Sequence, residues 1–239
     1  SIFLKSKDVC DRDVLLQDFP NKEATKFIEF SKASQQIDTN INILYFDDIQ
    51  EDNYDGFLVV DTNSYELVPR LKGKKVFGVI DHHNPVSFDI ETNIYIYDSS
   101  APAVAELITQ IFSEFDPLPE KQLKLVSMAL AMGIISDTAR FKSGRPETFE
   151  ILAELIRKSG KTYEELRIIM HTKRDEMSKI AILSSLKRLD YRVINEYIVV
   201  VSEADNSEAE VASMLTDGIA DVAFVVRWVN GEKKTRISA

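Results

Sequence analysis

The strongest constraint on this chain is the stretch KVFGVIDHHNP, residues 75–85. A short apolar run rich in strand-forming residues ends in Asp81, His82 and His83, and the Asn-Pro pair that follows stops the strand. Two of the three histidines in the chain are therefore adjacent at the end of a strand. A rigid strand followed by three groups that bind metal or move protons is typical of a catalytic loop.

A second apolar run, residues 56–60, ends in Asp61. Its continuous apolar character predicts a strand buried on both faces, as in a parallel sheet. Because strand carboxyl ends face the ligand crevice of a doubly wound sheet, we expect Asp61 to lie at the same edge as Asp81-His82-His83. A third carboxylate, Asp137, follows a long apolar helix that we predict over residues 118–135.

Plainer interpretations exist for each of these residues. Asp61 alone is typical of a turn at a strand end, and Asp137 of a loop after a helix. A carboxylate at the negative end of a helix is unfavourable without a nearby cation, which favours a ligand role for Asp137. Adjacent histidines alternate in direction, so His82 or His83 can bind a metal while the other faces a substrate. Carboxylate and imidazole ligands together suit Mn²⁺ and similar ions.

A basic loop follows Asp137 in an otherwise acidic chain. It contains Arg140, Lys142 and Arg145, which are typical of a solvated surface but would form a phosphate clamp beside a metal site. Ser100 and Thr138 are most often caps or loop residues, and next to the same site they become candidate substrate ligands.

The formal net charge of −10 argues against tight binding to long nucleic acids, because many phosphates would have to be met by Lys and Arg. A small anionic substrate stays compatible, since a metal cluster supplies local positive charge. The single cysteine, Cys10, excludes an internal disulfide framework. The longest apolar runs are too short to span a bilayer and no secretory signal is evident, which favours a cytoplasmic setting. The chain lacks an initiator Met and ends in strand-like residues, so we expect it to be part of a longer protein.

The overall pattern predicts an α/β fold with a doubly wound, mostly parallel sheet over residues 1–160, a helical linker over 161–189, and a smaller, truncated α+β domain over 190–239. In the first domain we expect strands at 13–17, 41–46, 56–60, 75–81 and 94–97, and helices at 22–33, 103–112 and 118–135, the second of these capped by Ser99 or Ser100. Residues 147–189 are helical in about three pieces. In the last domain we expect a strand or hairpin at 191–202, a helix at 207–215, and strands at 219–229 and 234–238 joined by Asn230-Gly231.

Four segments resemble, in order, successive motifs of the DHH phosphoesterase superfamily: GFLVVDT at 56–62, IDHH at 80–83, DSSAPAVAEL at 98–107 and GIISDTARF at 133–141. This superfamily includes RecJ-like exonucleases, short-oligonucleotide RNases, phosphoadenosine-phosphate phosphatases, cyclic-dinucleotide phosphodiesterases and exopolyphosphatase-like enzymes. The resemblance covers roughly residues 20–160, and residues 190–239 resemble the start of the associated DHHA1-like substrate-binding domain.

This resemblance implies that Asp61 bridges two Mn²⁺ or Mg²⁺ ions and that His82 and Asp137 are ligands of the same cluster. It also implies that Asp81 orients the histidines without binding the metal itself. His83 would face the scissile phosphate, stabilising charge or protonating the leaving group, and the metals would activate a water for in-line attack.

Two departures from the superfamily pattern concern the site. The first motif, a strand ending in His-x-x-x-Asp-x-Asp and opening a helix, has its only similar spacing at residues 10–13, where Asp11 and Asp13 are poor substitutes. We find no strand–loop–helix pattern that fits, and expect the motif to lie outside these residues or in a segment missing near 8–11. The glycine-rich, histidine-containing substrate motif is also absent.

We therefore predict a metal-dependent phosphoesterase that hydrolyses small nucleotides or short oligonucleotides, and a homodimer is compatible with the sequence. An alternative is a degenerate DHH module that serves as a non-catalytic binding or scaffold protein. A third option, inorganic pyrophosphatase or exopolyphosphatase activity, uses a related Asp-His-His site.

Overall fold

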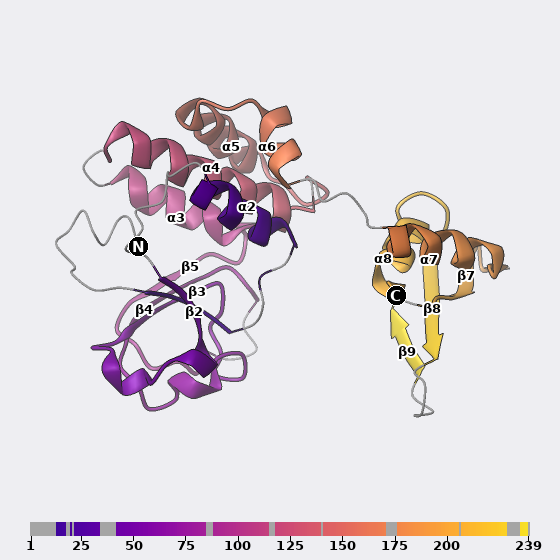
Figure 1. The fold of residues 1–239 in the computed structure, drawn as a ribbon, viewed down its shortest axis with the longest axis horizontal. Coiled ribbons are helices and arrows are strands. Elements are labelled where there is room, and N and C mark those ends of the chain that lie inside the picture. The colour runs from indigo at the N-terminus through magenta and orange to yellow at the C-terminus, as the bar shows by residue number, and fades with distance from the viewer. Residues whose placement is uncertain are drawn as a thin grey trace. The chain divides into compact units, whose positions relative to one another are not determined.

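The structure is a computed structural model, and it describes residues 13–17, 20, 22–33, 42–84, 88–114, 118–139, 141–170, 176–205, 207–228 and 235–238. The chain divides into two compact units, Ser1–His171 and Thr172–Ala239 (Figure 1). Helix α6 (Tyr163–Met170) belongs to the first unit and helix α7 (Glu176–Lys187) to the second. The segment that we expected to act as a linker, residues 161–189, is thus divided between the two units.

In the first unit, every described strand pair is parallel, which confirms the predicted α/β class. One sheet pairs β1 with β2, and a second has the order β3-β4-β5. Single turns of 3₁₀ helix, η1, η2 and η3, occupy the connections around β3. The bounds are β1 (Asp13–Leu16), β2 (Asn42–Tyr45), η1 (Phe46–Asp48), η2 (Glu51–Asn53), β3 (Phe57–Val60), η3 (Pro69–Leu71), β4 (Val76–Asp81) and β5 (Tyr95–Tyr97).

The register of the three-stranded sheet brings the ends of its strands together. Val60 pairs with Ile80, and Asp81 pairs with Tyr97. The amide of Asp61 donates to the carbonyl oxygen of Ile80 at 2.9 Å, so Asp61 follows β3 directly beside the end of β4. Parallel pairing therefore places the carboxyl ends of β3, β4 and β5 at one edge of the sheet.

A helical layer packs beside these strands (Figure 1). Its buried side chains come mainly from α3, α4, α5 and α6, and Phe27 and Phe30 of α2 pack against them. The bounds are α2 (Lys22–Ala33), α3 (Val104–Ser113), α4 (Glu120–Asp137) and α5 (Pro146–Ser159). Helix α4 continues two residues beyond the predicted end and so includes Asp137.

Strand β3 is not buried on both faces, contrary to the sequence-based expectation. Phe57 and Val59 are buried, whereas Leu58 and Val60 are 49% and 41% exposed. The reason is its position, because β3 is an edge strand and α3 packs over Ile80 of β4 on that face. An uninterrupted apolar run therefore did not distinguish an edge strand from a central one.

Helix α3 also begins differently from the prediction. Its N-cap is Ala103, which makes no side-chain capping hydrogen bond, so neither Ser99 nor Ser100 caps it. Instead, the hydroxyl and the amide of Ser100 both donate to Asp98 Oδ1, at 2.6 and 2.8 Å. These bonds close a tight turn between β5 and α3.

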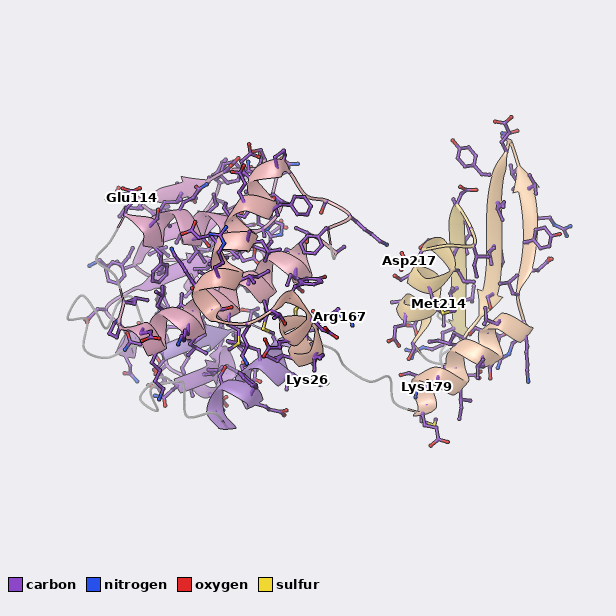
Figure 2. All side chains as sticks on the ribbon, turned by 90° about the horizontal axis from the view of Figure 1, so that it is seen from above. Lys26, Glu114, Arg167, Lys179, Met214 and Asp217 are labelled. Atoms are coloured by element: carbon purple, nitrogen blue, oxygen red, sulfur yellow. The ribbon has the colours of Figure 1, made fainter. Side chains whose placement is uncertain are left out.

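The second unit has the mixed sheet order β6-β7-β8-β9, with β6-β7 and β8-β9 antiparallel and β7-β8 parallel. Helices α7 and α8 pack against it, and Figure 2 labels Lys179 on α7 and Met214 on α8. Residues 191–202 form the expected hairpin, whereas the predicted Asn230-Gly231 turn lies outside the described residues. The bounds are β6 (Asp190–Ile194), β7 (Tyr197–Glu203), α8 (Glu208–Thr216), β8 (Val222–Trp228) and β9 (Thr235–Ser238). Among the described residues, no helix is both long and apolar enough to cross a bilayer.

Candidate functional site

Asp61 adopts a backbone conformation that is uncommon for a residue other than glycine. Its φ of 67° lies in the left-handed region, which aspartate tolerates better than most residues but at a cost in free energy. This turn aims the carboxylate along the edge of the sheet, where Oδ1 lies 3.3 Å from His82 Nε2 and 3.9 Å from His83 Nδ1. Burial raises the pKa of the Asp61 carboxyl, although His83 and His82 act in the opposite direction.

His82 is held in one orientation by the backbone that precedes α3. Its Nδ1 lies 2.9 Å from the carbonyl oxygen of Ala101. Because a carbonyl only accepts hydrogen bonds, Nδ1 carries a proton, and Nε2 is the ring atom that faces Asp61 and could bind a metal. The side chain is 14% exposed, so His82 is both oriented and partly shielded from water.

His83 and the fully buried carboxylate of Asp81 form a second fixed pair. His83 Nδ1 donates to Asp81 Oδ1 at 2.8 Å, and Asn63 Nδ2 donates to Asp81 Oδ2 at 2.5 Å. The bond to Asp81 raises the pKa of His83, while its side chain stays 58% exposed. Asp81 thus orients His83, whereas Ala101 orients His82. Asn63 was not identified from the sequence, although it follows Asp61 by two residues.

Asp137 reaches the same region from the end of α4. It is the last residue of that helix, where the helix dipole is negative. Burial raises the pKa of its carboxyl, and the negative charge of Asp61 raises it further. His82 and His83 act in the opposite direction, so all four groups share one electrostatic environment.

These side chains fit a divalent cation. Among the described residues, Asp61, His82 and His83 each offer a ligand atom, and these atoms all lie within 4.8 Å of one another. The two carboxylates whose pKa is raised, Asp61 and Asp137, are destabilised in their charged form without a positive partner, which a cation would supply.

Sequence analysis missed Glu23, which lies in the first turn of α2 and contacts the last turn of α4. Ser136 Oγ donates to Glu23 Oε2 at 3.2 Å, which places this carboxylate against the last turn of α4, where Ser136 precedes Asp137. Strand β1 and helix α2, both expected from the sequence, follow each other in the order that the first motif requires. The spacing His-x-x-x-Asp-x-Asp falls there on Gln17, Asn21 and Glu23. Of these three positions, Asn21 lies outside the described residues.

Arg145 is committed to contacts within the protein. Its Nε and Nη2 donate to Glu106 Oε2 at 3.2 and 3.0 Å, and its Nη1 donates to Ser100 Oγ at 2.7 Å. Glu106 is fully buried, and Thr148 Oγ1 donates to its other oxygen at 2.6 Å. The structure thus assigns Arg145 and Ser100 to an internal network, whereas the sequence had suggested contacts with substrate.

The other three candidate substrate ligands, Thr138, Arg140 and Lys142, differ in position. Thr138 is fully buried, and its hydroxyl donates to the carbonyl oxygen of Ile134 at 2.7 Å and accepts from the amide of Phe141 at 3.1 Å. It closes α4 and is inaccessible to a ligand in this conformation. Lys142 is exposed on the same loop, and Arg140 lies outside the described residues.

The pKa shifts predict how the metal-free protein responds to pH. A carboxyl whose folded-state pKa is raised contributes stability at pH below its ordinary value and loses it as pH rises through the raised pKa, and the same holds for His83. Lowering the pH from about 8 to about 6 should therefore raise the melting temperature of chelator-treated protein through His83. The measurement is thermal unfolding at several pH values in the presence of EDTA.

The control for this prediction is His83→Gln, which keeps a polar side chain but cannot gain a proton. Part of any acid stabilisation will come from the general relief of negative charge, because the chain carries a net charge of −10. We expect a smaller pH response in the variant than in the wild type. Identical responses in both proteins would contradict the raised pKa of His83.

Comparison with known protein sequences gives two uncharacterized relatives from Methanocaldococcus jannaschii. The first is 29% identical over 185 residues, which is 76% of this chain, and the second is 33% identical over 102 residues, which is 43% of this chain. The chain spans 54% of the length of the first relative and 20% of the second. No family model matches the chain.

Two solved structures share the fold. An exopolyphosphatase-related protein from Bacteroides fragilis superposes with a TM-score of 0.74 over 98% of this chain and 71% of its own, at 18% identity. A Methanococcus jannaschii protein described as a candidate family II inorganic pyrophosphatase superposes with a TM-score of 0.50 over 84% of this chain and 71% of its own, at 15% identity. At these identities, the superpositions show a shared fold and nothing beyond it.

Proposed function

We propose that this chain contains the catalytic centre of a divalent-metal-dependent phosphoesterase. The observation that carries the proposal is the convergence of Asp61, His82 and His83 at one edge of the sheet, with Asp81 buried behind them. Apolar strands hold these groups, and a hydrogen bond fixes the orientation of each histidine. The phosphatase-type names of both structural neighbours support the same reaction class.

Asp61, His82 and Asp137 are the ligands that we propose, with Glu23 as a fourth. A bound Mn²⁺ or Mg²⁺ would act as a Lewis acid on a phosphoryl oxygen and would lower the pKa of a bound water. We keep two ions as our proposal for the full site. Gln17 and Asn21 are neutral where the superfamily motif has histidine and aspartate, so any second ion would be held more weakly.

His83 is the residue that we propose to contact the reacting phosphate. Its Nδ1 is already bonded to Asp81, so a second proton would be carried on the exposed Nε2. The hydrogen bond to Asp81 raises the pKa of His83 and so favours this imidazolium, which can stabilise charge on phosphate. From Nε2 it can also donate a proton to the leaving oxygen. Asp81 would hold the ring and stabilise its charge throughout.

The direct test is hydrolysis by the full-length protein. We expect it to cleave short oligonucleotides, 3′-phosphoadenosine 5′-phosphate or cyclic dinucleotides in the presence of Mn²⁺, and to lose this activity on chelation. Release of nucleotide or phosphate measures the reaction. The proposal is rejected if the metal-loaded protein cleaves none of these substrates.

Glu23→Gln sharpens this test, because it removes one carboxylate charge with little change in shape. We expect it to lower Mn²⁺ affinity by about 10- to 100-fold, the range typical of residues that support a metal site. Glu29→Gln, on the exposed face of the same helix, is the matched control and should bind Mn²⁺ like the wild type. Equal affinities in the two variants would remove Glu23 from the proposed site.

Inorganic polyphosphate and pyrophosphate are a second class of substrate, favoured by the names of the two structural neighbours. The same metal-loaded assay with pyrophosphate and tripolyphosphate separates this option from a nucleotide substrate. Faster turnover of these inorganic compounds than of every nucleotide tested would identify an inorganic substrate.

A further inference from the structure

Beside His83, the edge of the sheet carries an aromatic pair that the proposed mechanism does not use. The rings of Phe88 and Tyr97 lie 4.9 Å apart at 86°, and those of Phe88 and Tyr95 lie 5.3 Å apart at 83°. The hydroxyl of Tyr97 donates to the carbonyl oxygen of His83 at 2.9 Å. Tyr97 is thus bonded to the backbone of the residue that we place at the phosphate, and the ring of Phe88 packs against that of Tyr97.

Phe88 is 50% exposed, yet the segment that carries it is held in place. The next residue but one, Ile90, is buried, and its carbonyl oxygen accepts from the hydroxyl of Tyr95 at 2.6 Å. Asp89 Oδ1 accepts from the amide of Tyr65 at 2.9 Å. A ring that is followed by anchored residues and is open to water is prepared to cover a flat apolar group.

The charge around this pair indicates what such a group would be. Residues 84–97 contain two acidic side chains, Asp89 and Glu91, and no Lys or Arg. A chain of phosphates that ran from His83 across this segment would meet two like charges and no cation belonging to the segment. An uncharged planar ring would meet no such repulsion, and aromatic side chains stack on any nucleobase because every base has a π-face.

We propose that Phe88, supported by Tyr97, stacks the nucleobase of a substrate whose phosphate lies at Asp61, His82 and His83. This inference rests on the proposed function and narrows its substrate to nucleotide phosphoesters over inorganic phosphate chains. The stack recognises the presence of a base and not its identity, since the described contacts of Phe88 are with rings alone.

The test compares two ligands that share a sugar phosphate and differ in the base: AMP and ribose 5-phosphate. Binding to the full-length, Mn²⁺-loaded protein is measured by isothermal titration calorimetry. We expect AMP to bind at least about tenfold more tightly, as base–aromatic stacking typically provides. In Phe88→Leu the two affinities should come within about twofold of each other, because the aromatic face is lost while apolar bulk remains. Phe88→Trp should restore the preference for AMP.

Phe77→Leu is the matched control. Phe77 on β4 is 45% exposed, and Lys75 lies over its ring. The variant therefore loses a comparable aromatic surface away from the site. It should keep the preference for AMP. Equal binding of AMP and ribose 5-phosphate by the wild type, or an unchanged preference in Phe88→Leu, would overturn the stacking inference and leave the proposed function standing. If neither ligand binds and no phosphoester is cleaved, the proposed function fails together with it.

Discussion

Asp61→Asn is expected to lower metal-dependent phosphoester hydrolysis by about a thousand-fold, because a catalytic metal supplies several kcal/mol and each 1.36 kcal/mol is tenfold in rate. Asp61 is the carboxylate that lies within 4.8 Å of both histidines in the candidate cluster. Replacing it with a neutral amide removes the negative charge that would offset the cation. The measurement is kcat/KM at saturating Mn²⁺.

Asparagine is the appropriate replacement because it keeps the side-chain shape and tolerates the left-handed backbone at this position, where φ is 67°. The variant should therefore fold, and without metal it should be at least as stable as the wild type, since burial disfavours the charge on Asp61. Asp55→Asn, an exposed position in the loop before β3, is the control and should retain full activity. Full activity in Asp61→Asn would contradict the proposed metal site.

Arg145→Met is expected to destabilise the first unit by about 3–5 kcal/mol, the usual cost of leaving one member of a buried ion pair uncompensated. Glu106 is fully buried, and Arg145 provides its only charged partner among the described residues. The same substitution frees the turn at Asp98 and Ser100, which Arg145 also contacts, at 3.4 and 2.7 Å. That turn leads to Ala101, whose carbonyl oxygen orients His82.

Hydrogen exchange resolved by peptide is the suitable measurement, because it reports the two units separately. Peptides from α3 and α5 should lose protection in Arg145→Met, while those from the second unit should not change. Adding Glu106→Gln should recover part of the loss by removing the buried charge. Lys124→Met is the control, because its partner Glu120 is exposed and such pairs contribute about 0.3–0.5 kcal/mol. A similar loss in both single variants would contradict a special role for the Arg145–Glu106 pair.

The positions of Asp61, Asp81, His82 and His83 at one edge of the sheet were predictable, because two apolar runs end in polar groups and parallel strands align their carboxyl ends. What the sequence could not supply was the detail of orientation. The partner of His82 is a backbone carbonyl in a turn 19 residues away. Such a contact depends on the path of the chain and leaves no mark in side-chain pattern.

The role of Arg145 illustrates a second limit. Three basic residues in one loop are typical of a solvated surface and, beside a metal site, were candidates for a phosphate clamp; the Arg145 guanidinium instead binds Glu106, a residue 39 positions earlier in the chain. A glutamate on an apolar helix carries no sequence signal for its partner, so the pairing follows only from the packing of α3 against α5. Glu23 was missed for a different reason: the residues at the first-motif spacing are Gln, Asn and Glu, so no His or Asp marks the motif, although a strand at 13–17 and a helix at 22–33 were both expected.

The central claim is that a divalent ion binds where β3, β4 and α4 end. Equilibrium dialysis of the full-length protein against Mn²⁺, with metal quantified by atomic emission, tests it most directly. The account predicts saturable binding by the wild type and by Asp55→Asn, and binding that is lost or strongly weakened in Asp61→Asn. No binding by the wild type, or equal binding by all three proteins, would contradict it and would favour a non-catalytic module.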